Sequence, residues 1–222
     1  MIECALDDTL GGARIQVGND ADLGLVAEHV RGAAVGHDDV VFIAGEVGVG
    51  GGCVIGGRPL LGAGGYAGEL GHLPLMPGGR RCRCGAHGCW ETEIGGPAIA
   101  RALNAQGATS EELLVAVRRL SASTSAALDG VAHFLGVGLA GLVNLLNPQL
   151  VIIGGLLGEV FALCAPKVRI ALDAAALTAP AEQVRLVTPT LGGDAVLIGA
   201  SEIAWAELLL DPANLLGGAS DG

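Results

Sequence analysis

Aromatic and basic residues are both scarce in this chain of 222 residues. Aromatics make up 3% of the sequence, so the core must be built from Ala, Val, Leu and Ile, within an overall hydrophobic content of 51%. Lys and Arg number 12 against 23 Asp and Glu, and the longest basic run is Arg80-Arg81. Because a duplex-binding surface normally needs a basic stripe, this chain alone is predicted not to bind nucleic acid.

The chain also lacks the sequence features that direct a protein into or across a membrane. Its first residues, MIECALDDTLGG, have neither a basic lead nor the apolar stretch of a secretory signal. The longest apolar run, Phe134 to Leu146, is shorter than the roughly 20 residues that span a bilayer, and it ends at Asn147-Pro148. We therefore predict a cytoplasmic protein with no membrane partner, in which this run is a core helix.

Strand and helix patterns alternate along the chain, which predicts an α/β layer architecture. A helix should end near residue 10, and residues 45–52 should form the turn of a hairpin. Residues 56–88 should be largely irregular, and 211–222 a flexible tail. Strands are expected at 13–17, 40–44, 53–55, 151–153 and 184–187, and helices at 21–34, 97–106, 110–120, 122–146, 157–177 and 195–210.

Three cysteines stand close together at the end of the irregular segment. Cys82, Cys84 and Cys89 place three soft metal ligands within eight residues. A closed structural zinc site takes four ligands, and both His72 and His87 are near enough to supply the fourth. Spacing alone does not choose between them. A metal would order a loop that has no secondary structure of its own. The alternative is an ordinary group of loop cysteines, with or without redox activity.

The other cysteines stand apart from this group. Cys4, Cys53 and Cys164 lie singly in apolar sequence and are expected to be core residues. Without a secretory signal the chain should stay in a reducing compartment, where clustered cysteines more often bind metal or catalyse than form disulfides.

Carboxylates flank the cysteine group. Glu69 and Glu91 lie on either side of it with His72, and Asp20 opens a predicted helix. Sugar recognition needs several such groups, because each bonds adjacent hydroxyls, and a carboxylate beside a reacting hydroxyl can act as a general base. The alternatives are a helix N-cap for Asp20 and a first-turn helical carboxylate for Glu91.

Two glycine-rich segments are candidates for nucleotide contact, because backbone N–H groups can bind phosphate. The first contains Gly48, Gly50 and Gly51, and the second is Gly154-Gly155, which follows a predicted strand. Ordinary turn glycines are the alternative for both.

Taken together, these motifs resemble the ROK family of sugar kinases and sugar-responsive transcription regulators. The specific part is Glu69-Leu70-Gly71-His72 followed by Cys82-x-Cys84-Gly85-x-x-Gly88-Cys89-x-Glu91. The likeness runs from Asn19-Asp20-Ala21 through the glycine run at 48–52, Asn144 to Pro148, Gly154-Gly155 and residues 191–200, and so covers nearly the whole chain.

The resemblance implies an α/β fold of the actin-like, RNase H-like ATPase type. It implies a small-lobe remnant over 1–38 and a large lobe over 39–210, with a zinc knuckle at 69–91. It also implies a structural Zn²⁺ on His72, Cys82, Cys84 and Cys89, which chooses His72 over His87. Sugar contacts are implied for Asn19, Asp20, Glu69, His72 and Glu91, with Asp20 as the base in members that phosphorylate.

Two departures separate this chain from the kinases of that family. Their Asp-x-Gly-Gly-Thr phosphate loop lies well upstream of the Asn-Asp pair, whereas only eighteen residues precede Asn19 here; in Leu10-Gly11-Gly12, Thr9 and Ala13 replace the aspartate and threonine. Kinases also read Gly-Thr-Gly where this chain reads Glu46-Val47-Gly48. A hydroxyl is lost there, and a carboxylate stands where it would repel polyphosphate.

These features predict the sugar-sensing, oligomerising portion of a regulator whose DNA-binding winged helix lies in an upstream domain. The expected ligand is a hexose or amino-hexose, free or as its 6-phosphate, and the expected assembly is a homodimer or higher homo-oligomer. One alternative is a hexose kinase that uses ATP and Mg²⁺. Another is a non-catalytic remnant that only dimerises.

Overall fold

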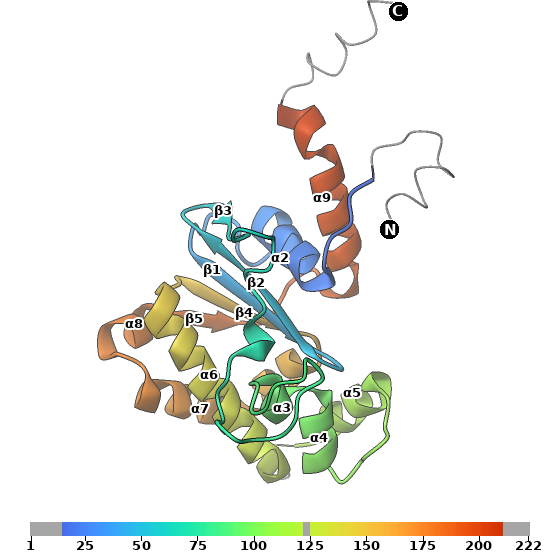
Figure 1. Ribbon diagram of the computed structural model, residues 1–222, viewed down its shortest axis with the longest axis vertical. Coiled ribbons are helices and arrows are strands. Elements are labelled where there is room, and N and C mark those ends of the chain that lie inside the picture. The colour runs from blue at the N-terminus through green and yellow to red at the C-terminus, as the bar shows by residue number, and fades with distance from the viewer. Residues whose placement is uncertain (1–14, 122–124, 211–222) are drawn as a thin grey trace, which may run out of the picture.

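The computed structural model describes residues 15–121 and 125–210, arranged as a twisted sheet with helices on both faces (Figure 1). Predicted features at residues 1–14 and 211–222, including Cys4, the early helix end and the flexible tail, lie outside the described residues. The strands are β1 (Val40–Gly45), β2 (Val49–Ile55), β3 (Arg58–Pro59), β4 (Leu150–Gly154) and β5 (Arg185–Val187). The helices are α2 (Asp20–Arg31), α3 (Glu91–Ile94), α4 (Gly96–Ala102), α5 (Ser110–Arg118), α6 (Asp129–Leu146), α7 (Gly155–Ala175), α8 (Thr178–Gln183) and α9 (Ala195–Leu210), with 3₁₀ turns at Leu70–His72, Ser125–Leu128 and Gly192–Asp194.

The five strands are ordered β3-β2-β1-β4-β5. The hairpin strands β1 and β2 are antiparallel, whereas β1–β4 and β4–β5 are parallel. The strands β1 and β4 are buried on both faces, because their residues alternate between two cores. Val41 and Ile43 face the core formed with α6 and α7, and Val40 and Phe42 face a smaller core beneath α2. The unbroken apolar runs of β1 and β4 are the pattern expected of a sheet covered on both faces.

The hairpin differs from the sequence expectation in one respect. Residues 45–52 were predicted to form the turn, but Gly45 ends β1 and residues 49–52 belong to β2, so the turn is limited to residues 46–48. The glycines of β2 are required by what packs on the strand. A Cβ on Gly51 would lie 2.7 Å from Leu70 Cδ1, and one on Gly52 would lie 2.9 Å from Asp22 Oδ1.

Other elements follow the predictions with smaller changes. The helix at 195–210 and the central strands form as expected, but residues 15–17 of the predicted strand at 13–17 form no strand; residues 13 and 14 lie outside the described residues. That segment instead leads into the cap of α2. The short elements β3, α3 and α8 were not predicted, because two to six residues give too little pattern to recognise.

Helix α6 lies in the core, as predicted for the long apolar run. By length and composition alone residues 125–146 could cross a membrane, yet 56% of the most apolar window is buried inside the structure. Two glycines let its neighbours approach closely. A Cβ on Gly136 would lie 2.4 Å from Val168 O of α7, and one on Gly138 would lie 2.0 Å from Trp90 Cε2.

A buried carboxylate fixes the helix that begins at Asp20. Glu28 of α2 is fully buried and accepts hydrogen bonds from the backbone N–H groups of Thr190 and Leu191, both at 2.8 Å. These residues precede α9, which also packs closely on α2, because a Cβ on Gly199 would lie 1.9 Å from Leu23 O. The predicted division into lobes after residue 38 stays a prediction.

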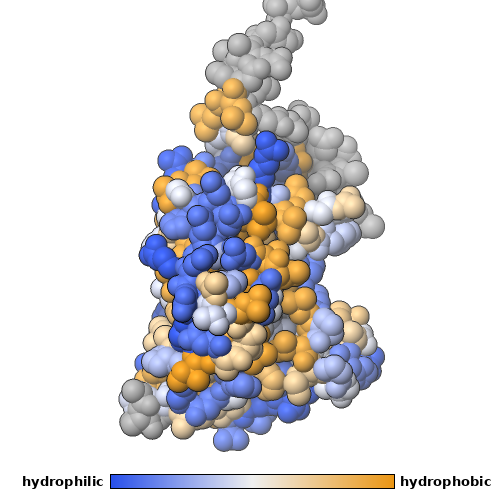
Figure 2. Space-filling view, turned by 90° about the vertical axis from the view of Figure 1, so that its left-hand side faces the viewer, coloured by the Kyte–Doolittle hydropathy of each residue, from blue (hydrophilic) through white to orange (hydrophobic). Residues whose placement is uncertain are grey.

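Helix α9 extends away from the sheet beyond α2 (Figure 1). Its outer side chains are apolar and exposed: Leu197 is 70%, Leu209 68% and Leu210 85% accessible. Apolar side chains are visible at the upper end of the described molecule in Figure 2. Exposed apolar groups gathered in this way mark an interaction surface more often than isolated ones do.

Candidate metal centre and its neighbouring carboxylates

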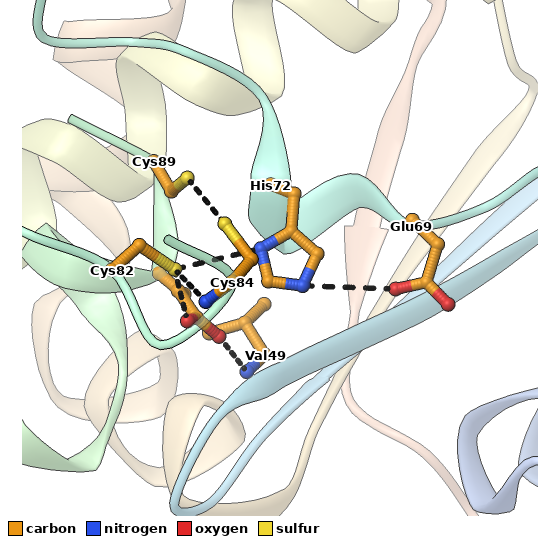
Figure 3. A network of polar contacts seen from close by, with 7 residues as sticks. Val49, Glu69, His72, Cys82, Cys84 and Cys89 are labelled. Carbon is orange, nitrogen blue, oxygen red and sulfur yellow. Dashed lines mark hydrogen bonds and ion pairs between the residues drawn. The ribbon is translucent and has the colours of Figure 1, made fainter. Parts of the chain in front are cut away.

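The structure brings His72 together with Cys82, Cys84 and Cys89, and the ligand atoms of these four residues all lie within 4.8 Å of one another. The Sγ atoms of Cys84 and Cys89 are 3.6 Å apart, and Cys82 Sγ is 3.7 Å from His72 Nδ1 (Figure 3). A tetrahedral zinc ion with Zn–S bonds of about 2.3 Å holds two sulfurs about 3.8 Å apart. The donor set and its spacing therefore fit a metal ion, whereas the exposed His87 is not part of the cluster.

The knuckle forms because the chain reverses twice at glycine. Gly85 and Gly88 have φ values of 96° and 76°, a region that side chains rarely allow. A Cβ on Gly88 would also lie 1.7 Å from Met76 O, so only glycine fits against that strand-like segment. The next residue but one, Trp90, is fully buried and donates its Nε1–H to Phe134 O at 2.8 Å. The core therefore holds one end of the metal loop.

Glu91 connects the metal cluster to the hairpin. The Cys82 thiol donates to Glu91 Oε1 at 2.8 Å, and Val49 N–H donates to Oε2 at 3.4 Å (Figure 3). Burial, followed by the bond to Glu91, raises the pKa of the Cys82 thiol. The Ala86 backbone N–H lowers the pKa of the exposed Cys84 thiol. A bound metal would take Cys82 as thiolate and leave Glu91 to find another hydrogen-bond donor.

The two ring nitrogens of His72 face different groups. Nδ1 faces the sulfurs, and Nε2 lies 3.9 Å from Glu69 Oε2, on the side away from the cysteines (Figure 3). A metal on Nδ1 would fix the tautomer that carries its proton on Nε2. His72 can thus serve the metal and still present a donor beside Glu69.

Asn19, rather than Asp20, caps helix α2. Its Oδ1 accepts from Ala21 N–H at 2.8 Å, so the alternative reading of Asp20 as the N-cap is wrong. Asp20 is the first helical residue and is exposed, and its Oδ1 also accepts from Ala21 N–H at 2.8 Å. Among the described residues, only one oxygen of the Asp20 carboxylate has a hydrogen-bond partner, which leaves the other as a candidate ligand contact.

Asp22 joins this group of carboxylates, and the sequence reasoning did not assign it. Burial raises its pKa, and the charges of Glu69 and Asp20 raise it further, so the three carboxylates are electrostatically in contact. Its position three residues after the cap was visible in the sequence. Its significance depends on Glu69, which only the fold brings near.

The glycine candidates lie in two different settings. Gly50 and Gly51 pair with β1, and Gly48 ends the turn, where a Cβ would lie 3.2 Å from Glu91 Oε2. Gly154 ends β4, and Gly155 begins α7 with φ 61°. A Cβ on Gly155 would lie 2.7 Å from Gly45 O and 3.4 Å from Glu46 Cγ, so the Glu46 side chain lies beside the start of α7. Nucleotide contact by these five glycines stays a prediction.

Comparison with known proteins agrees with the fold and the motifs. A model of the ROK family matches residues 2–207. The glucokinase of Halalkalibacterium halodurans is 32% identical over 202 residues, covering 82% of this chain and 61% of that protein. The xylose repressor of Bacillus subtilis is 28% identical over 187 residues, covering 83% and 49% respectively. The chain thus spans about half to two thirds of the length of these relatives.

The solved structures that resemble this chain include the same two classes of protein, transcription regulators and sugar kinases. A ROK family transcriptional regulator, described as a homologue of the E. coli MLC protein, aligns with a TM-score of 0.78 at 27% identity, over 92% of this chain and 55% of that one. A ROK family glucokinase from Streptomyces griseus, in complex with glucose and AMPPNP, aligns with a TM-score of 0.79 at 29% identity, over 92% and 72%. These matches confirm the predicted ROK-type α/β fold.

Proposed function

The chain belongs to the ROK family, and we propose that it is the sugar-sensing, oligomerising portion of a ROK-type transcriptional regulator. The observation that carries the proposal is an intact Cys₃His cluster, whose histidine lies beside Glu69 and whose Cys82 is bonded to Glu91. A structural metal ion would order this loop, so that the side chains that face the sugar are held in place before the sugar binds.

The sugar would lie among Asn19, Asp20, Glu69, His72 and Glu91. Carboxylates accept hydrogen bonds from hydroxyl groups, and the Nε2–H of a metal-bound His72 donates one. Asp22 adds charge to the same group of side chains and is an additional candidate contact. The expected ligand is a hexose or amino-hexose, free or as its 6-phosphate.

The surroundings of α7 favour a sensor over a kinase. Phosphoryl transfer depends on positioning the phosphates and Mg²⁺. The side chain of Glu46 lies beside the start of α7, where Gly154 and Gly155 were the nucleotide candidates. Two unit charges 5 Å apart repel by about 3 kcal/mol at an effective dielectric constant of 20. A carboxylate in that place therefore opposes polyphosphate binding.

Relatives support a regulator and suggest its partners. The xylose repressor of Bacillus subtilis and the DNA-binding transcriptional dual regulator NagC of Escherichia coli, 28% and 32% identical respectively, are regulators by name. DNA contact would come from a domain upstream of this chain. We propose a cytoplasmic homodimer or higher homo-oligomer, for which the exposed apolar residues of α9 are a candidate contact.

Titration calorimetry of the zinc-loaded protein tests the proposal. The ligands are glucose, N-acetylglucosamine and xylose, together with the 6-phosphates of the first two. Saturable binding of one of them, lost in Asp20→Asn and retained in Asp38→Asn, is expected. No heat with any of these sugars would count against sensing.

The second candidate is an ATP-dependent hexose kinase with Asp20 as general base. The identity of 32% to a glucokinase favours it, as does the position of the exposed Asp20 carboxylate at the start of α2. A coupled assay for ADP release decides: sugar-dependent turnover abolished by Asp20→Asn would place the kinase first. If neither sugar nor ATP binds and sedimentation shows a dimer, the third reading holds, a module that only dimerises.

A further inference from the structure

The four donors of the metal cluster differ in their access to solvent. Cys84 is exposed at the tip of the knuckle, whereas Cys82 is only 4% and Cys89 only 1% accessible. A small oxidant that diffuses to the cluster therefore meets Cys84 first. Cys53 and Cys164 are as buried as Cys89 and lie outside the cluster, so they share neither the access nor the neighbours of Cys84.

The geometry also selects a partner for Cys84. Its Sγ is 3.6 Å from Cys89 Sγ, whereas Cys82 Sγ accepts from the Cys84 backbone N–H at 3.5 Å (Figure 3). A disulfide has an S–S bond of about 2.05 Å, so the sulfurs of Cys84 and Cys89 need to approach by about 1.5 Å. The positive-φ residues Gly85 and Gly88 lie between them, and the turn already holds the two side chains face to face.

We propose that Cys84 and Cys89 form a peroxide-sensitive pair that closes to a disulfide and expels the metal. The Cys84 thiolate attacks one oxygen of hydrogen peroxide; an S–O bond forms, the O–O bond breaks, and hydroxide leaves. The Cys89 thiolate then attacks the sulfenic sulfur, the S–O bond breaks, and a second hydroxide leaves. With two protons taken up by the two hydroxides, two thiolates and one peroxide yield one disulfide and two waters. Each sulfur loses one electron to the peroxide.

Closure of this pair removes half of the donor set. Only His72 and Cys82 remain, which is too few for a closed zinc site. The loop that positions His72 beside Glu69 then loses its metal anchor, and sugar affinity should fall. This final step, from metal loss to sugar loss, rests on the proposed function; the disulfide and the metal release do not.

Three measurements on the full zinc-loaded chain test the pair. Graded hydrogen peroxide is added, zinc release is followed with a chromogenic chelator, and peptide mass spectrometry locates the oxidised cysteines. Zinc release in step with an 84–89 disulfide is expected, with recovery of the metal after a thiol reductant and added zinc. Sugar binding is titrated on the same samples.

Each outcome decides one part. A disulfide that includes Cys82, or sulfinic acid on Cys84 without a disulfide, would overturn the pairing. Zinc that stays bound after the disulfide has formed would overturn the proposed expulsion of the metal. A disulfide with zinc release but unchanged sugar affinity would uphold the pair and contradict the proposed dependence of sugar binding on the metal. The oxidation is repeated on zinc-free protein, as a control for unfolding caused by loss of the metal. The 84–89 disulfide should form there too. The control variant Cys53→Ser should leave zinc release, formation of the 84–89 disulfide and sugar binding unchanged.

Discussion

Trp90 is the residue through which the core holds the metal loop, and Gly138 is the position that admits it. A Cβ added at Gly138 would lie 2.0 Å from Cε2, 2.3 Å from Cζ2 and 2.5 Å from Nε1 of the buried indole. The ring is fully buried and its Nε1–H is bonded to Phe134 O. Gly138→Ala must therefore displace either the ring or helix α6.

The expected size of this effect follows from two opposing contributions. Overpacking a well-packed core costs about 1–3 kcal/mol, and more where nothing can move. Replacing glycine by alanine inside a helix returns roughly 0.5–1 kcal/mol. With a contact this short, we expect Gly138→Ala to lower the free energy of unfolding by about 2 kcal/mol. For a chain of this length that corresponds to a fall in Tm of roughly 4–8 °C.

Gly141 offers a matched control on the same helix. It is exposed, and a Cβ there would meet nothing within 4 Å. Gly141→Ala should therefore stabilise the protein by up to about 1 kcal/mol through helix propensity alone. Both variants are compared with the unmodified protein in zinc-loaded form by urea denaturation followed by circular dichroism. If Gly138→Ala is as stable as Gly141→Ala, the close packing of Trp90 on α6 does not exist, and the core does not anchor the knuckle as described.

Three further changes test the site. Cys84→Ser should lower zinc content and sugar affinity together, while Cys53→Ser leaves both unchanged; unaltered sugar binding by zinc-free protein would separate the two properties. Glu46→Thr should raise ATP affinity at least tenfold in a binding titration, since a like charge beside α7 is removed; no gain would show that this carboxylate does not oppose nucleotide. The raised pKa of Asp22 means that its ionised form opposes folding, an effect absent below its ordinary pKa of 3.8 and complete once the pH exceeds the raised value. Asp22→Asn should thus be more stable than the parent at pH 7 and lose that advantage near pH 3; equal gains at both values by urea denaturation would contradict the charge argument.

Sequence pattern predicted the elements whose burial is uniform along their length. The β-branched runs of β1 and β4 were recognised because nearly every residue in them is buried. Pattern failed at β2, where glycines are dictated by Leu70 and Asp22 packing against the strand. A glycine required by a distant side chain looks, in sequence, the same as one required by a turn.

The candidate site was predictable to a similar extent. Three closely spaced cysteines indicated a metal, but the spacing of His72 and His87 could not decide the fourth ligand; the family resemblance did, and the fold places His72 in the cluster. The link from Cys82 through Glu91 to Val49 joins three segments of the chain, and no local pattern encodes it.

A metal bound to this cluster would have a mechanical role beyond coordination, because Trp90 and Glu91, which follow the ligand Cys89, contact the core and the hairpin. The knuckle is fixed to the core at one end by Trp90, and to the hairpin by Glu91. A change at a bound metal would therefore reach two places at once: the turn at Glu46–Gly48, and the histidine beside Glu69. In a kinase such coupling would have to be held rigid for phosphoryl transfer. In the proposed sensor it would be useful, because sugar and metal would then shift one shared equilibrium that includes the hairpin, and each ligand would strengthen the binding of the other by the same factor.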